Sequence, residues 1–190
     1  MESTQPTSAA QQAIAYLGFE AFEKAKAYRG ALLVVDGESK PLEFRCTAPV
    51  HPTDLQRTLY GASLLPHILT DLIGSPLIST AREKLGVIII TDAAFFDVRL
   101  KISTPVIRII RADGKDAKHA DGTRSQSLLL QSASGKFDHV MVEAHPKFPA
   151  DLDSCGDRFR DLFSKWNLLE PFQRMIEGLK YIHDEHVLES

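Results

Sequence analysis

Two uninterrupted apolar runs limit what this chain can fold into. Residues 31–35 read ALLVV and residues 87–90 read VIII. A strand that faces solvent on one side alternates apolar and polar residues, so an unbroken run is typical of a strand buried on both faces. We therefore predict an α/β fold, or an α+β fold, in which a single mixed sheet carries other layers.

The remaining strand patterns predict about six strands in that sheet. Leu42, Phe44 and Cys46 alternate with polar residues and follow the turn residues Asp36 and Gly37, which predicts a β-hairpin with residues 31–35. Three further strand patterns are VIRII at 106–110, SLLLQ at 127–131 and HVMVEA at 139–144.

Helical patterns precede, interrupt and follow the strands. Ser8 and Gln11 form a capping box before apolar residues at helical spacing, which predicts an N-terminal helix. A long middle helix is expected from Asp54, with a kink at Pro66, and two more helices are expected at the C-terminus. The predicted parts of the chain are a disordered N-terminus (1–7), an α/β core domain (8–153) and a C-terminal helical segment (154–190) packed on the core or extending from it.

Charge and composition narrow the expected partners. The chain has 190 residues, a net charge of -3 and a pI near 6.2. Proteins that bind nucleic acid or acidic membranes through a broad surface usually need positive charge, so we predict no nucleic-acid partner and no membrane partner. Neither a secretory signal pattern nor an apolar run of membrane-spanning length is found, and the two cysteines lack metal-ligand spacing. We predict a cytoplasmic protein without a cofactor.

Four carboxylates are the candidates for a metal site. Asp36 and Asp92 each follow a predicted buried strand, Asp97 lies about one helical turn beyond Asp92, and Glu143 lies in a strand pattern. Gathered together, they could hold Mg²⁺ or Mn²⁺ for a hydrolase that acts on phosphoester bonds. The alternative is that Asp36 and Asp92 have purely structural roles, because aspartate is favoured both in an Asp-Gly turn and at a helix N-cap.

The C-terminal helices carry the aromatic residues that favour our main functional hypothesis. No nucleophile-elbow or nucleotide-binding motif is present. Large side chains at helical spacing usually belong to a core, and an excess of them forms a partner surface. We therefore predict a non-catalytic module that docks a protein partner or self-associates. A small-molecule sensor with an apolar pocket between the sheet and the long helix is a further alternative. The candidate interface residues are Phe159, Phe163, Trp166, Phe172 and Met175.

One stretch resembles known sensory and scaffold domains. The sequence GALLVVDGESKPLEF, residues 30–44, resembles the glycine, apolar strand, Asp-Gly turn and return strand of profilin-like folds such as roadblock, GAF and PAS domains. The short helix expected between the strands at 87–90 and 106–110 departs from the roadblock plan. We therefore assign the chain to no family and transfer no functional residue.

Overall fold

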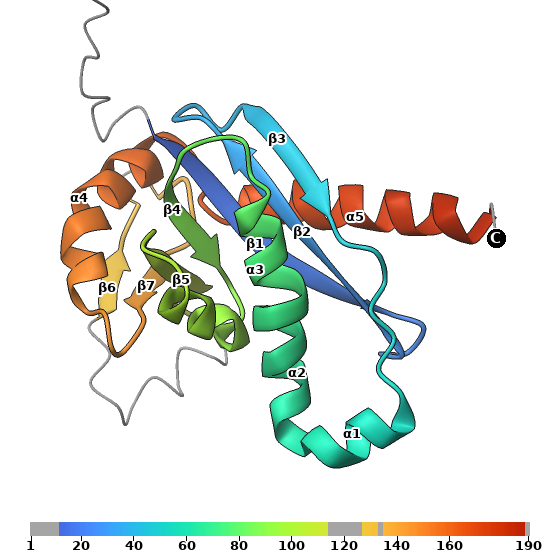
Figure 1. The fold of residues 1–190 in the computed structure, drawn as a ribbon. Helices are drawn as coiled ribbons and strands as arrows, with labels where there is room; N and C mark the ends of the chain where they lie inside the picture. The colour runs from blue at the N-terminus through green and yellow to red at the C-terminus, as the bar shows by residue number, and fades with distance from the viewer. Residues whose placement is uncertain (1–11, 114–126, 133–134, 189–190) are drawn as a thin grey trace, which may run out of the picture.

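The computed structural model describes residues 12–113, 127–132 and 135–188. Within these residues the strands form one mixed sheet with the order β3-β2-β1-β4-β5-β7-β6 (Figure 1). Strands β1, β4 and β5 run parallel, and the other neighbours pair antiparallel. The predicted mixed α/β sheet is confirmed. The strands are β1 (Ala13–Phe22), β2 (Ala27–Val35), β3 (Pro41–Cys46), β4 (Leu85–Ile90), β5 (Val106–Arg111), β6 (Ser127–Leu130) and β7 (Val140–Ala144).

Helices connect the strands and cover both faces of the sheet. They are α1 (Asp54–Tyr60), η2 (Gly61–Ser63), α2 (Leu64–His67), η3 (Ile68–Gly74), α3 (Ser75–Ser79), η4 (Ala93–Leu100), α4 (Ala150–Lys165) and α5 (Glu170–Leu188). The predicted long middle helix is divided at Gly61, where the backbone has a φ of 51° and leaves helical geometry, so α1 lies at an angle to the run that leads from α2 to α3 (Figure 1). The type of turn changes on both sides of Pro66. No helix in the described part of the chain is long and apolar enough to cross a bilayer.

The N-terminal segment forms a strand where the helical spacing predicted a helix. Residues 13–17 are all buried, because β1 lies between β2 and β4 and both of its faces are covered. The turn that follows gives no sequence signal for a hairpin, since Glu23, Lys24 and Ala25 all adopt left-handed backbone angles without a glycine. The predicted disordered segment 1–7 lies outside the described residues.

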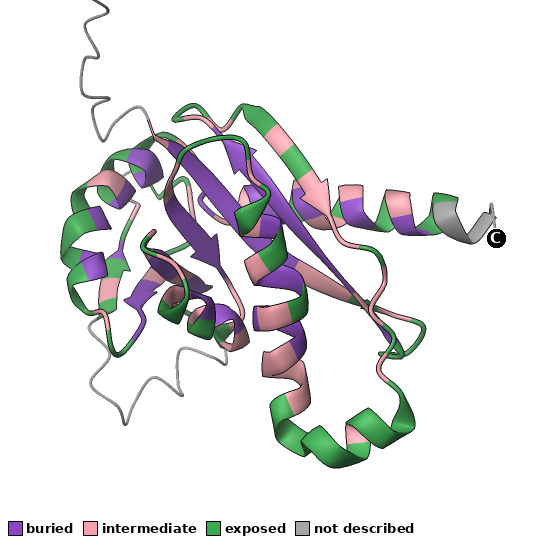
Figure 2. Cartoon of the chain, viewed as in Figure 1, coloured by how far each residue is buried: buried purple, intermediate pink, exposed green. Residues whose placement is uncertain are grey.

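The sheet separates two apolar cores, which explains the unbroken apolar runs. Ile14 and Tyr16 of β1 point to the core beneath α4 and α5, whereas Ala15 and Leu17 point to the core beneath η3 and η4. Most positions of β1, β2, β4 and β5 are therefore buried (Figure 2). The C-terminal helices lie against the sheet, with α5 crossing behind β1 and β2 (Figure 1).

The helical run approaches the sheet most closely at Gly30. A Cβ atom built on Gly30 would overlap the Cγ2 methyl of Ile73, which comes from η3. A second glycine, Gly74, lets the same helix approach Val98 of η4. Small residues at these points allow η3 to lie directly on the strands, and they fix the position of the helical run that leads back to α1.

Candidate functional site

The structure disperses the four predicted metal ligands. The Oδ1 atom of Asp36 accepts hydrogen bonds of 2.9 Å from the backbone N–H groups of Glu38 and Lys40, as expected of a turn residue. Because β2 runs antiparallel to β1, Asp36 lies at the end of the sheet where strands β1 and β4 begin. Asp92 follows the end of β4 and thus lies at the opposite end of the sheet.

The other carboxylates have structural partners of their own. Asp92 caps η4 by accepting a 2.8 Å bond from the N–H of Ala94. Asp97 is exposed, and Glu143 is buried in an ion pair of 3.1 Å with Arg108. Among the described residues, no group of three His, Cys, Asp or Glu side chains is placed to hold a metal ion. The four carboxylates therefore do not fit one shared cation.

The five predicted interface residues lie in the core beneath α4 and α5. Phe159, Phe163, Phe172 and Met175 are buried, and Trp166 is half-buried. Their spacing thus reflects the helix faces that pack on the sheet, which leaves little of these side chains for a partner.

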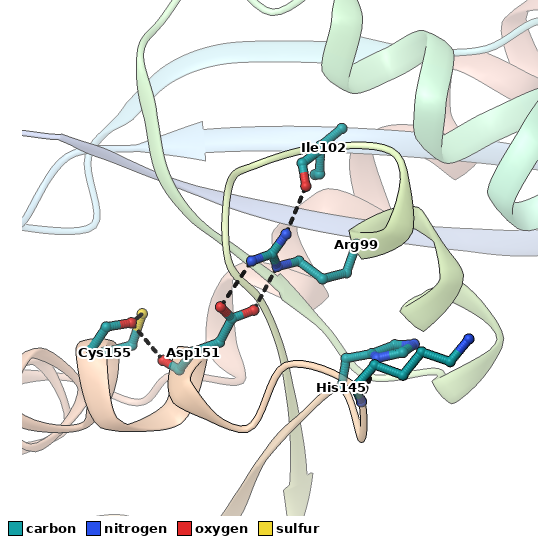
Figure 3. A network of polar contacts seen from close by, with 7 residues as sticks. Arg99, Ile102, His145, Asp151 and Cys155 are labelled. Carbon is teal, nitrogen blue, oxygen red and sulfur yellow. Dashed lines mark hydrogen bonds and ion pairs between the residues drawn. The ribbon is translucent and has the colours of Figure 1, made fainter.

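A buried polar network joins η4 to the start of α4 (Figure 3). The Arg99 guanidinium donates two hydrogen bonds to Asp151, with Nε at 2.7 Å and Nη2 at 3.1 Å, and a third of 2.7 Å to the carbonyl of Ile102. It also lies 4.0 Å from the centre of the Phe148 ring. Every strong interaction of this arginine is made within the protein, so the network holds the fold together.

His145 completes this region without forming an open site. Its Nδ1 accepts a 3.0 Å bond from the N–H of Lys147, and its Nε2 lies 3.6 Å from Oδ1 of Asp97. The ring is buried between Phe96 and Phe148. A histidine enclosed in this way positions the chain between β7 and α4.

The most exposed apolar surface lies on the segment from residue 53 to residue 72, which we call the arm. In Figure 1 its first helix, α1, lies at the end of the molecule farthest from the sheet, and Figure 2 shows α1 as almost entirely exposed. None of the residues of α1, η2 and α2 is buried. The large apolar side chains exposed on the arm are Leu55 (67%), Leu59 (72%), Tyr60 (41%) and Leu72 (43%).

Specific contacts hold the arm in place. Thr53 and Gln56 form a capping box that starts α1. The guanidinium of Arg57 donates a 2.9 Å bond to the carbonyl of Ala25, at the tip of the β1–β2 hairpin. The hairpin tip, which carries the exposed Lys24 and Lys26, is thereby attached to the arm.

Tyr60, His67 and Asp71 form a connected series along the arm. The rings of Tyr60 and His67 stack with their centres 5.0 Å apart and their planes 24° apart. Nδ1 of His67 lies 2.6 Å from Oδ2 of Asp71, and Lys101 donates to the other carboxylate oxygen. The bond from Lys101 lowers the pKa of Asp71, partial burial opposes this effect, and the bond from His67 adds to it.

A cavity of about 100 Å³ opens beside this series. It lies between the arm and the segment that follows β3. Its lining includes His51, Pro52, Gln56, Tyr60, Leu64 and His67. Two histidines and a tyrosine thus share one small hollow next to exposed apolar side chains.

Sequence reasoning missed the arm as a site. Leu55 and Leu59 lie four residues apart, a helical spacing that predicts an ordinary buried face. Among the described residues no other element covers α1, so this face stays exposed there. The only signal available in the sequence was the pair of His67 and Asp71, since residues four apart on a helix are neighbours.

Comparisons with known proteins give a limited likeness. No protein-family model matches the chain, and no curated protein matches it. The structure of human ENDOV is 12% identical with a TM-score of 0.48, and covers 96% of this chain and 89% of its own. The catalytic domain of human endonuclease V gives 12% identity, a TM-score of 0.49, and coverage of 96% and 88%. Endonuclease V from Ciona intestinalis, in complex with a 23mer DNA that contains inosine, is 13% identical with a TM-score of 0.43, and the match covers 70% of each chain.

These structures contradict two predictions from the sequence. They are nucleases, and two of the solved structures hold DNA. The predictions of a non-catalytic module for protein–protein interaction and of no nucleic-acid partner are therefore wrong, and we drop both. At this identity and TM-score, we transfer no residue role and no activity to this chain.

Proposed function

We propose that this chain binds a single-stranded segment of nucleic acid across the arm. The observation that carries the proposal is the stacked pair of Tyr60, which is exposed, and His67, which is half-buried, next to the exposed Leu55 and Leu59. Unpaired bases stack on aromatic side chains whatever their sequence, because every base has a π-face. The proposal rests on this chain's own geometry.

The stacking of Tyr60 on His67 prepares the tyrosine ring for a base. The contact with His67 limits the rotation of the ring, so little side-chain entropy remains to be lost on binding. Leu55 and Leu59 extend the apolar surface beside it. A base in contact with such a surface contributes about 1–3 kcal/mol to binding.

The hairpin tip supplies charge for the phosphates. Lys24 and Lys26 are exposed there, and the bond from Arg57 to Ala25 keeps the tip against the arm. The net charge of -3 argues against a broad basic surface, and the tip requires only a local one. Binding should therefore depend on stacking more than on charge.

A salt titration with labelled single-stranded oligonucleotide tests the role of the tip. Each phosphate contact on a single strand adds about 0.7 to the slope of log K against log salt. The double variant Lys24→Ala, Lys26→Ala should reduce the slope by about 1.4. The matched control is Lys165→Ala, Lys180→Ala on the C-terminal helices, which should leave the slope unchanged. Equal slopes for all three proteins would contradict the assigned phosphate contacts.

The cytoplasmic location inferred from the sequence stays a prediction. A fusion to a fluorescent protein, imaged in the source cells, would test it. Fluorescence confined to another compartment would contradict it.

A further inference from the structure

The cavity beside the arm brings two histidines to one place. His51 comes from the segment after β3, and His67 comes from α2, so the two arrive from different parts of the chain. Asp71 lies 2.6 Å from a ring nitrogen of His67, and Glu23 lies 3.6 Å from a ring nitrogen of His51. This arrangement goes beyond what strand binding requires.

The contact with Asp71 orients the imidazole of His67. The Asp71 carboxylate can only accept a hydrogen bond, so the 2.6 Å contact places the hydrogen of His67 on Nδ1. In the neutral ring with its hydrogen on Nδ1, Nε2 carries the lone pair. Lys101 also donates to Asp71 and keeps that carboxylate charged, so Asp71 orients the imidazole as the carboxylate of a catalytic dyad does.

His51 is the second imidazole of the cavity, and its Nε2 lies 3.6 Å from Oε1 of Glu23. Two imidazoles from different segments of the chain therefore line the same cavity. An imidazole serves as a general base in its neutral form and as a general acid in its protonated form.

We propose that this pair cleaves RNA by general acid–base catalysis. This inference rests on the proposed binding of single-stranded nucleic acid. RNA is the substrate class because its 2′-hydroxyl supplies the nucleophile within the substrate itself, whereas DNA lacks that group. Two imidazoles then supply the proton transfers that the reaction needs.

The step balances with these groups alone. Nε2 of His67 takes the proton of the 2′-hydroxyl, and the 2′-oxygen forms a bond to the adjacent phosphorus. The bond from phosphorus to the 5′-oxygen of the next nucleotide breaks, and that oxygen takes a proton from His51. The products are a 2′,3′-cyclic phosphate and a 5′-hydroxyl, and no oxidant, reductant or metal ion is consumed.

The test follows labelled RNA and DNA of one sequence with an excess of the full-length protein, in the presence of EDTA. Binding is read by anisotropy and products by mass spectrometry in the same samples. We expect RNA alone to be cut, with a 2′,3′-cyclic phosphate end. His67→Gln and His51→Gln should each lower the single-turnover rate by about 10²–10⁴-fold, the usual contribution of a general acid or base.

Two matched variants separate this role from a structural one. His139→Gln changes an exposed histidine away from the cavity and should leave the rate unchanged. The pH–rate profile of the wild-type protein should fall at both low and high pH. Each cavity variant should lose the pH dependence on one of these two sides.

Each outcome decides the proposal. Bound RNA that stays intact would overturn this inference and leave the binding function standing, whereas absence of binding would overturn both. Cleavage that persists in the double variant His51→Gln, His67→Gln, or that gives 5′-phosphate ends, would also overturn it.

Discussion

Arg99 and Asp151 form a buried, two-pronged ion pair across 52 positions of the chain. It joins the crossover between β4 and β5 to the first turn of α4, and the side chains are 13% and 9% exposed. Few other contacts between charged side chains in the described residues join such distant segments away from solvent. The pair therefore fixes the start of α4 to the half of the sheet that carries β5 and β7.

Removing one partner should destabilise the protein strongly. Asp151→Ala leaves the Arg99 guanidinium buried without its counter-charge, which typically costs about 3–5 kcal/mol. Chemical denaturation measures the free energy of unfolding. The control is Asp157→Ala, because the ion pair of Asp157 with Arg160 lies at the surface and contributes about 1 kcal/mol at most. Similar losses in both variants would contradict the assigned role.

Gly30 should be required for the close packing of η3. The methyl group of Gly30→Ala would overlap Ile73, and either the strand or the helix would have to move, at a cost of about 1–3 kcal/mol. Gly37→Ala serves as the control, since a Cβ there meets no atom within 4 Å. Thermal unfolding should distinguish the two. A neutral Gly30→Ala would mean that η3 lies farther from β2 than the structure places it.

Asp71 should add stability above the ordinary aspartate pKa of 3.8 and lose it in acid. Lys101 and His67 lower its pKa in the folded state, so the charged carboxylate favours folding. The contribution of Asp71 to stability is complete above about pH 3.8, and it disappears as the pH falls through the lower pKa of the folded state. The difference in unfolding free energy between wild type and Asp71→Asn should therefore shrink in acid. A difference that stays constant from about pH 5 to pH 3 would contradict this linkage.

The sequence predicted the sheet where the apolar pattern matched the burial. The buried run at 31–35, its return strand and the strands near Ile88 and Ile109 are all present. The pattern failed at β1, because Ile14 and Leu17 lie on opposite faces of a doubly covered strand and also fit helical spacing. The turn after β1 has no glycine that could have marked the hairpin.

The site was harder to predict than the sheet. Whether Asp36 and Asp92 meet depends on strand direction, and antiparallel pairing of β2 with β1 sends them to opposite ends of the sheet. Whether Leu59 belongs to the core or to the surface depends on whether another element covers α1. Local periodicity carries no information about that. Tertiary placement, and not residue type, therefore decided both questions.

The central claim is that the arm binds single-stranded nucleic acid through Tyr60. The most direct measurement is the anisotropy of a labelled single-stranded oligonucleotide with wild type, Tyr60→Ala and Tyr181→Ala. Tyr181→Ala is the matched control, because Tyr181 is also an exposed tyrosine, at 66%, and lies on α5 and not on the arm. Loss of one stacked base should weaken binding by roughly 5- to 150-fold in Tyr60→Ala and leave Tyr181→Ala unchanged. Absence of binding by the wild type, or equal affinity in both variants, would contradict the claim.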